Sequence, residues 1–414
     1  MKKILLISTL TSSLLLASGY RLPEGSINST ALSAAYVANA HGADSSYYNP
    51  ANMVFNKNIS QIEGDLTYIG LSEIDYKDSR APFFNGKTKQ ENILAPNLYY
   101  TSKDYNNFRY GMSLTVPGGL SKRWDSAYQK LFAKEFTLKI VEFNPSIAYK
   151  INDYFSIGAG ARAIYSEGIV KSDGMAITKL NKSLPTPNPA LNKPVIRDME
   201  ADTIEYGYNV AMSFKPDCYS TLSATYRSNV DLNHEGNAKL YLSGTKLYDG
   251  GASVEVPLPA VLALATSYDF GSTVVELGWD KTFWSEYKDL DFEFKDNVPL
   301  ALSAFDKSVP RNWNDTNAFR IGLTHQLNEK LTLMGGFAYD ESPVDDKYLG
   351  FELPDSDAKL YSGGFRYSYS DALSFGASVL YDQKDERSVT NDSVAGEFTD
   401  ASAFLLTTGI SYIY

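Results

Sequence analysis

Apolar and polar residues alternate with a period of two in many stretches of this chain. From residue 373 to 379 the odd positions hold Leu, Phe, Ala and Val, and the even positions between them are small or polar. Successive side chains of a β-strand point to opposite faces, so this stretch predicts a strand with one apolar face. The final residues repeat the pattern, with apolar side chains at Phe404, Leu406, Ile410, Tyr412 and Tyr414.

Fourteen such strands are expected, joined by connections of alternating length. Short turns at one end, long polar loops at the other and an even number of strands are typical of outer-membrane barrels, with both termini in the periplasm. A water-soluble sandwich is the alternative, but sandwiches seldom run this long as one domain. The short turns fall at 104–107, 152–153, 216–217, 270–271, 328–329 and 370–371. The expected strands cover 58–72, 91–102, 108–118, 138–150, 154–170, 202–215, 219–231, 253–268, 272–284, 316–327, 330–341, 357–369, 372–383 and 399–414.

The first residues predict a secretory signal peptide over residues 1–17. Lys2 and Lys3 precede a mostly apolar run from Ile4 to Ala17. That run is too short to span a membrane, and its flanking charges are those of a signal sequence. No later apolar run reaches the roughly 18 residues that a membrane-spanning helix needs.

Residues 18–57 are too rich in small residues to form a strand. We expect a helix over 31–40, capped by Ser29 or Thr30, followed by the tripeptide Asn49-Pro50-Ala51. A fourteen-stranded barrel is too wide for its own side chains to fill. The sequence therefore predicts an all-β fold: a 14-stranded antiparallel transmembrane β-barrel, residues 58–414, plugged by a small N-terminal hatch, residues 18–57.

Composition agrees with an exported barrel. The net charge of −11 disfavours nucleic acid as a partner, and 30 Tyr with 21 Phe supply the aromatic girdles of such barrels. The single cysteine, Cys218, excludes an internal disulfide. No cofactor and no metal site are expected.

Several short motifs, in their order along the chain, carry a resemblance to a known family. They are Gly19-Tyr20, Asn49-Pro50-Ala51, Tyr226-Arg227-Ser228 with Val230, Ala318-Phe319-Arg320-Ile321-Gly322 and Asp340-Glu341-Ser342-Pro343-Val344. The chain after the signal resembles the FadL-type outer-membrane transporters of long-chain fatty acids and other hydrophobic compounds, including the aromatic-hydrocarbon members. The resemblance implies passive uptake: substrate lands on an extracellular groove, binds in a luminal pocket beside the hatch, and leaves sideways through a gap in the wall.

The groove is expected in the loop after the third strand. With Ser121 as a cap, Trp124, Tyr128, Leu131 and Phe132 would form the apolar stripe of a helix. Such a stripe can bind acyl chains by burial, at roughly 0.8 kcal/mol per CH₂. The alternative is that it packs onto the barrel rim.

The gap is expected at Pro117-Gly118-Gly119. Proline cannot donate to the strand ladder, and glycines beside it mark a bulge or a break. The resemblance implies that the hatch asparagine, Asn49, touches this kinked strand. A plain loop start at Pro117 is the alternative.

The pocket residues come from the resemblance. Tyr20 takes the place of the usual phenylalanine near the mature start, and Asp340 matches the acidic pocket residue, here followed by Glu341. Lys171 lies near the family's arginine, and Arg311 is the nearest cation before the tenth strand. Solvated loop charges are the alternative interpretation of Lys171 and Arg311.

Other function classes are disfavoured or left open. An outer-membrane phospholipase needs a Ser–His pair; the histidines are His41, His234 and His325, and no serine lies in a nucleophile motif, so no enzyme is expected. An adhesin or phage receptor could use loops 172–201 and 285–315. Expected partners are a fatty acid or another hydrophobic molecule, outer-membrane lipid and lipopolysaccharide. A closed barrel has no free edge, which favours a monomer.

Overall fold

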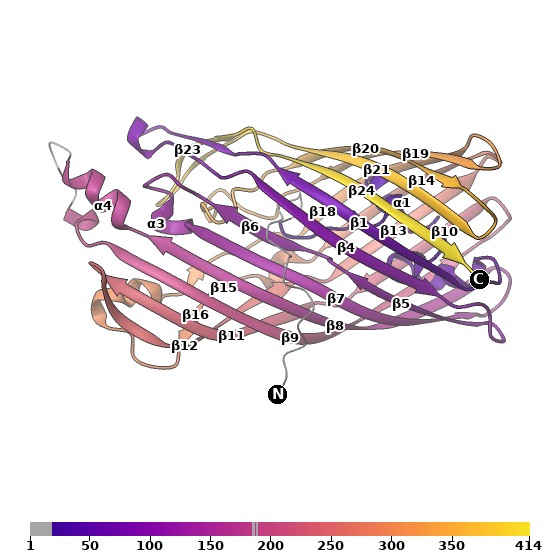
Figure 1. Cartoon of the computed structure of the whole chain (residues 1–414), viewed down its shortest axis with the longest axis horizontal. Helices are drawn as coiled ribbons and strands as arrows, with labels where there is room; N and C mark the ends of the chain where they lie inside the picture. Colours follow the sequence, from indigo (N-terminus) through magenta and orange to yellow (C-terminus); the bar gives the residue numbers. More distant parts are fainter. Residues whose placement is uncertain (1–18, 184–186, 188) are drawn as a thin grey trace.

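The computed structural model describes residues 19–183, 187 and 189–414, and the signal peptide expected over 1–17 lies outside them. Within these residues, fourteen wall strands close into one antiparallel barrel whose strands lean across the long axis (Figure 1). Each wall strand pairs with the next along the chain, and the last pairs with the first. The predicted fold class and strand number are confirmed.

The wall strands, three of which continue past an interruption, lie close to their expected positions. In order they are β1 (Gln61–Leu71), β4 (Glu91–Thr101), β5 (Phe108–Thr115) continued by β6 (Gly119–Arg123), β7 (Glu135–Lys150), β8 (Phe155–Asp173), β9 (Val195–Phe214), β10 (Ser220–Arg227) continued by β11 (Val230–Leu242), β12 (Thr245–Leu258) continued by β13 (Val261–Asp269), β14 (Thr273–Thr282), β18 (Thr316–Gln326), β19 (Leu331–Asp340), β20 (Ala358–Ser368), β21 (Leu373–Lys384) and β24 (Ser402–Ile413).

The long connections gather at the end of the barrel opposite the C-terminus (Figure 1). Among the described residues, no helix is long and apolar enough to cross a membrane. The shorter elements of these connections are β2 (Asp75–Asp78), η2 (Pro82–Phe84), β3 (Gly86–Lys87), α3 (Lys130–Ala133), α4 (Met175–Lys182), η3 (Pro189–Leu191), η4 (Trp284–Glu286), β15 (Asp289–Leu290), β16 (Phe292–Phe294), η5 (Leu300–Phe305), β17 (Val309–Pro310), β22 (Arg387–Thr390) and β23 (Ala395–Thr399).

One expected loop, residues 232–252, is instead a long hairpin of β11 and β12. Buried residues of β11 alternate with exposed polar ones, which is the period of a strand. Ser243 and Gly244, at the hairpin tip, both have positive φ (53° and 82°). Two such residues form the tight turn that matches strand twist, so the sequence interpretation of a loop was wrong here.

The outer surface of the wall is apolar where the strands are regular. On β4, Leu94 and Leu98 are exposed, whereas Asn97 between them points inward and is buried. An apolar exterior with polar residues facing the lumen is the pattern of membrane barrels. Exposed aromatic side chains cluster at the end with the short turns, as expected for an interfacial girdle: Tyr105, Tyr110, Tyr149, Tyr154, Tyr219, Tyr268, Phe270, Tyr369, Tyr412 and Tyr414.

Residues 19–57, the N-terminal segment, lie inside the barrel. The segment contains α1 (Ile27–Ala31), α2 (Ser45–Tyr48) and η1 (Pro50–Phe55). Its polar groups bond to inward side chains from wall strands on every side, including Asn97, Ser156, Ser213, Glu276, Arg320, Arg366 and Thr407. The segment is therefore bonded to wall strands from several sides of the described barrel.

The helix expected over 31–40 is wrong in position. α1 starts earlier, because Ser26 accepts a hydrogen bond from the Ser29 amide and caps it. The chain then turns sharply at Ser33 and Ala34, which have positive φ. The Ser33 carbonyl accepts a hydrogen bond from Arg320, so the barrel wall overrides the local helical pattern.

The N-terminal segment approaches the wall closely at one of two neighbouring glycines, so alanine substitutions at these two positions should differ in their effect on stability. A Cβ at Gly336 would lie 2.2 Å from the carbonyl carbon of Leu32, whereas one at Gly335 would meet nothing closer than 3.7 Å. We expect Gly336→Ala to destabilise the protein by about 1–3 kcal/mol through overpacking, and Gly335→Ala to cost nothing. Thermal unfolding of the two purified variants measures this; equal melting temperatures would contradict the packing described.

Candidate functional site

The third wall strand is interrupted where the sequence predicts a break. β5 ends at Thr115 and β6 begins at Gly119. The N-terminal segment pairs with this interruption: the Leu22 amide donates to the Pro117 carbonyl (2.9 Å), and the Gly119 amide donates to the Tyr20 carbonyl (2.8 Å). Residues 20–22, hereafter the strap, therefore satisfy backbone groups that the broken strand leaves unpaired.

Gly118 permits this close approach. A Cβ at Gly118 would lie 2.4 Å from the Tyr20 carbonyl oxygen, well inside contact distance. Arg21 forms an isolated antiparallel bridge with Gly118. Any larger residue at 118 would push the strap away from the wall, which explains why a glycine is placed here.

Among the described residues, the hydrogen bonds of Asn49 run to residues other than those of the third strand, which the resemblance implies as its partner. Its amide nitrogen donates to the Val37 carbonyl (2.8 Å) and to Ser213 on β9 (3.0 Å), and its oxygen accepts from the Ala51 amide. Pro50 begins η1, and the Ala51 carbonyl accepts from Ser156 on β8. The Asn49-Pro50-Ala51 tripeptide therefore fixes the segment to a different part of the wall.

A cavity of about 60 Å³, the upper cavity, lies on the long-loop side of the strap. Two of the predicted pocket residues, Tyr20 and Arg311, line it together. Most of its remaining lining is apolar and comes from several strands and loops: Leu120, Phe136, Leu138, Val170, Met199, Val256, Leu290, Phe292, Trp313 and Leu353. Convergence of apolar side chains with a few polar groups is the usual form of a small-molecule site.

Tyr20 and Arg311 are each held by protein partners. The Tyr20 hydroxyl donates to the Pro257 carbonyl, and its ring lies against Trp284, with 4.7 Å between ring centroids. Burial raises the pKa of Tyr20 well above its usual value. Arg311 forms a buried ion pair with Glu352. The cation in the upper cavity is therefore already neutralised by a carboxylate.

Lys171 and Asp340, the other two predicted pocket residues, lie elsewhere. Lys171 is on β8 and is ion-paired with Glu200 (3.0 Å) and Asp198 (3.4 Å). Asp340 is buried 3.5 Å from Arg320. Neither side chain lines the upper cavity.

The aromatic residues expected in the groove pack inward. Trp124 is fully buried, its indole nitrogen donates to the Phe351 carbonyl (2.8 Å), and Tyr128 is 7% exposed. Leu131 and Phe132 are partly buried against the same cluster. The helix expected after Ser121 is wrong, since β6 pairs with β7 and only α3 is helical. The stripe packs against neighbouring loops through Phe351 and Phe84, rather than onto the barrel rim as the alternative interpretation had it.

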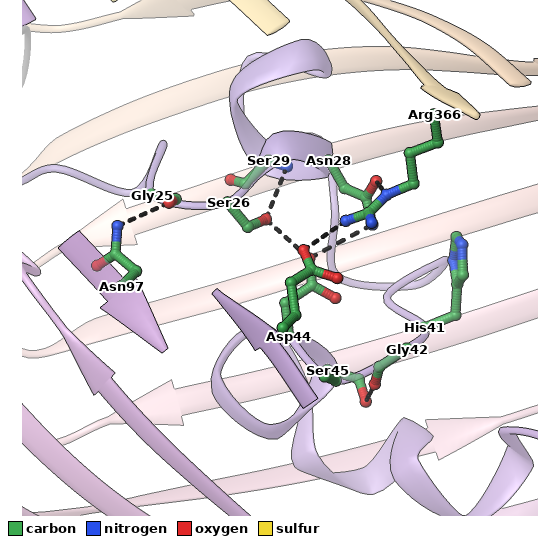
Figure 2. A network of polar contacts seen from close by, with 12 residues as sticks. Gly25, Ser26, Asn28, Ser29, His41, Gly42, Asp44, Ser45, Asn97 and Arg366 are labelled. Atoms are coloured by element: carbon green, nitrogen blue, oxygen red, sulfur yellow. Dashed lines mark hydrogen bonds and ion pairs between the residues drawn. The ribbon is translucent and has the colours of Figure 1, made fainter. Parts of the chain in front are cut away.

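Two buried arginines hold the N-terminal segment to the wall. Arg320 lies within 3.5 Å of carboxylate oxygens of Glu24, Asp280 and Asp340. Arg366 donates to the Asn28 side chain and pairs with Glu63 (2.5 Å), beside Asp44 (Figure 2). Removing one partner of a buried ion pair lowers the stability of the protein, because the other partner is left as an uncompensated buried charge.

Asp44 lies at the centre of the second network. It accepts hydrogen bonds from Ser26 (2.8 Å), Asn28 (3.3 Å) and Tyr36 (3.1 Å), as Figure 2 shows in part. Burial and the nearby charge of Glu63 raise the pKa of Asp44 to about 7. Burial likewise raises the pKa of Glu24 to about 7.

Glu276 anchors the N-terminal segment, and the sequence interpretation missed it. Its carboxylate accepts three backbone hydrogen bonds, from Val37, Ala38 and Asn39 (2.6–2.9 Å). Its signal in the sequence is a charged residue between the apolar Val275 and Leu277, on the face of β14 that is buried in the lumen. Charges at such positions need a partner in the lumen.

The family comparison agrees with this architecture. A family model described as "Outer membrane protein transport protein (OMPP1/FadL/TodX)" matches residues 8–414.

The chain belongs to this family. A member of the OMPP1/FadL/TodX family with this fold is an outer-membrane transport protein. Outer membrane protein P1 of Haemophilus influenzae is similar to this chain at 24% identity, covering 98% of this chain and 99% of the relative. The long-chain fatty acid transport protein of an Escherichia coli O6:H1 strain is 23% identical, covering 96% and 95%.

Solved structures of the OMPP1/FadL/TodX family share the fold. A Pseudomonas aeruginosa FadL homologue superimposes with a TM-score of 0.82 at 19% identity, covering 95% of this chain and 99% of that one. The Pseudomonas putida toluene transporter TodX gives 0.71 at 18% identity, with the same coverage.

The Asp44 network predicts a pH-dependent stability. The folded protein binds the proton of the Asp44 carboxyl group more tightly than the unfolded chain does, so protonated Asp44 contributes to the free energy of unfolding. That contribution is fully present below the unfolded pKa of about 3.9 and is lost as pH rises through about 7. We expect the melting temperature to fall between pH 5 and pH 8. Asp44→Asn should reduce that fall, while Asp392→Asn, on an exposed loop residue, should not. An unchanged pH profile for Asp44→Asn would contradict this assignment.

Proposed function

We propose that this protein mediates passive uptake of long-chain fatty acids or similar hydrophobic molecules across the outer membrane. Substrate binds in the upper cavity and leaves sideways through the break at Pro117 when the strap moves. The observation that carries the proposal is the position of the strap, which lines an apolar cavity with Tyr20 and closes a wall break with its backbone. Residues 18–57 act as the hatch.

The upper cavity as described corresponds to a closed state. Its volume is about 60 Å³, whereas an engineered dry cavity that binds benzene measures about 150 Å³. A long acyl chain therefore requires the Tyr20 ring to leave its position against Trp284 and Trp313. Since Tyr20 belongs to the strap, binding and opening of the break are coupled in this proposal.

Aromatic hydrocarbons are the second candidate substrate. The Arg311 charge is paired with Glu352, so the described lining of the upper cavity presents no unpaired arginine or lysine to a carboxylate. Its aromatic lining, with Phe136, Phe292 and Trp313, suits flat apolar rings. Two related solved structures, described as toluene transporters, make this candidate worth testing beside oleate.

Three further expectations belong to the proposal. The barrel acts as a monomer in contact with lipopolysaccharide, carries no catalytic activity, and could serve in addition as a receptor through loops 172–201 and 285–315. Antibody protection of those loops without loss of uptake would reveal a receptor role.

Filling the upper cavity tests the proposal. Val256 points into this cavity and is 9% exposed, whereas its neighbour Glu255 is exposed on the other face of β12. In cells whose only transporter for hydrophobic compounds is this protein, we expect Val256→Trp to abolish uptake of labelled oleate and Glu255→Gln to leave it unchanged. Both variants must reach the outer membrane in a folded form, which heat-modifiable gel mobility checks.

Uptake of oleate and of toluene, measured in parallel, distinguishes the two candidate substrate classes. Uptake of toluene but not oleate by the wild type would select the aromatic-hydrocarbon function. Uptake of neither, despite correct insertion, would reject transport of these compounds. Normal oleate uptake by Val256→Trp would reject the upper cavity as the binding site.

A further inference from the structure

A groove of about 500 Å³, the wall groove, lies on the outer surface of the barrel and shares no described lining residue with the upper cavity. It runs over β9, β10, β13 and β14, toward the end of the barrel that carries the C-terminus (Figure 1). The short turns lie at this end, and short turns of such barrels face the periplasm. The rim of the wall groove is formed by Met212, Phe214, Leu222, Leu264, Leu277 and Trp279.

Two small side chains produce the hollow. Thr266 lies between Leu222 and Leu277 in the strand register, and one row further from the turns Ala224 lies between two larger side chains. Leu222 and Leu277 are 47% and 53% exposed, whereas Ser223 points to the lumen and is buried. One small residue in each of two successive rows therefore leaves a groove on the face that points away from the lumen.

Membrane lipid covers this face, because the chain belongs to a family of outer-membrane proteins and the outer face of such a wall lies against the bilayer. The bilayer is itself apolar, so burial alone gives no preference for one site on the wall over another. An acyl chain that lies in a groove contacts more protein atoms than one on a flat wall. The wall groove is therefore a place where one lipid chain is held in preference to its neighbours.

An aromatic cluster marks the depth of the wall groove in the membrane. Tyr268 stacks on Tyr219, with 6.2 Å between ring centroids, and lies 4.6 Å from the Phe270 ring. Aromatic side chains of this kind gather at the level of the lipid head groups. Thr266 is two residues from Tyr268 on the same face of β13, so its exposed hydroxyl lies at the level where it can donate to a lipid ester carbonyl.

The two turns below the wall groove carry unpaired negative charge. Asp217 and Asp269 lie in these turns, and among the described residues no lysine or arginine is within ion-pair distance of either carboxylate. Backbone hydrogen bonds from Tyr219 and Ser220 lower the pKa of Asp217. The nearest basic residue in sequence, Lys215, instead lies with its ammonium group 4.4 Å from the centre of the Phe55 ring. The charge below the groove therefore suits a cationic group.

We propose that the wall groove binds a phospholipid of the periplasmic leaflet whose head group carries a primary ammonium. One acyl chain lies over Ala224 between the rim side chains, Thr266 donates to the ester, and the ammonium group lies beside Asp217 and Asp269. Thr266 and Asp269 are three residues apart, or about 10 Å along a strand, which a phosphoethanolamine head group can span. This inference depends on the membrane location of the wall and not on transport.

Two phospholipids with identical acyl chains test the head-group assignment. Purified protein in detergent is titrated with phosphatidylethanolamine or phosphatidylglycerol, and native mass spectrometry measures the bound lipid. We expect phosphatidylethanolamine to bind about 3- to 10-fold more tightly, which is the size of effect that two exposed charge pairs supply. Equal affinity of the wild type for both lipids would overturn the assignment.

Charge variants locate the source of the preference. Asn at 217 and 269 keeps the acceptor that each turn uses for backbone amides and removes the charge, so the double variant Asp217→Asn, Asp269→Asn should lose the preference while both lipids still bind. Asp371→Asn removes an exposed carboxylate from a turn elsewhere and should leave the preference unchanged. A preference that persists in the double variant would overturn the role of these two aspartates.

Filling the wall groove tests the acyl-chain site. We expect Ala224→Trp to lose the saturable binding of phosphatidylethanolamine. Ala377→Trp is the matched control, because Ala377 also lies on the outer face, between Phe375 and Val379 of β21, and outside the groove. Both variants must show the heat-modifiable gel mobility of the folded barrel. Unchanged binding by Ala224→Trp, or an equal loss in Ala377→Trp, would overturn the proposal.

Discussion

The structure depends on how the N-terminal segment satisfies the backbone groups of a broken wall strand. A proline and two glycines interrupt the third strand, and inside a membrane unpaired backbone groups are costly. The strap supplies the missing partners through Leu22 and Tyr20. The same three residues lie between the upper cavity and a second cavity of about 80 Å³, which Arg21 and Leu22 line. A single backbone pairing therefore closes the wall and divides the lumen.

The size of the barrel makes the rest of the segment necessary. Fourteen strands enclose more space than wall side chains fill, and the segment occupies it with small residues that approach wall glycines closely, as Leu32 does at Gly336. Its polar backbone is satisfied by inward charges, with Glu276 accepting three amides and Arg320 bonding the Ser33 carbonyl. These anchors bond residues 32–39, whereas the strap is held by its own backbone pairing with Pro117 and Gly119.

The wall was largely predictable from the sequence, because a two-residue period and turn residues are local signals. The interruption at Pro117 was predictable for the same reason. The segment that pairs with the interrupted strand was not predictable. The strap and the third strand are about a hundred positions apart in the sequence, and only the closed barrel brings them together. The prediction of a helix around Trp124 was wrong, although the spacing of its apolar residues fits a helix. Pairing of β6 with β7 and contact of Trp124 with Phe351 determine the structure instead.

Hydrogen–deuterium exchange at two amides measures whether the strap closes the wall break. The amides of Leu22 and Gly119 donate the two hydrogen bonds that close the break. We expect both amides to be protected in the ligand-free protein and to exchange faster when oleate is bound, while amides of the β1–β24 pair stay protected throughout. Free exchange of both amides without ligand, or full protection in the oleate-saturated protein, would contradict it.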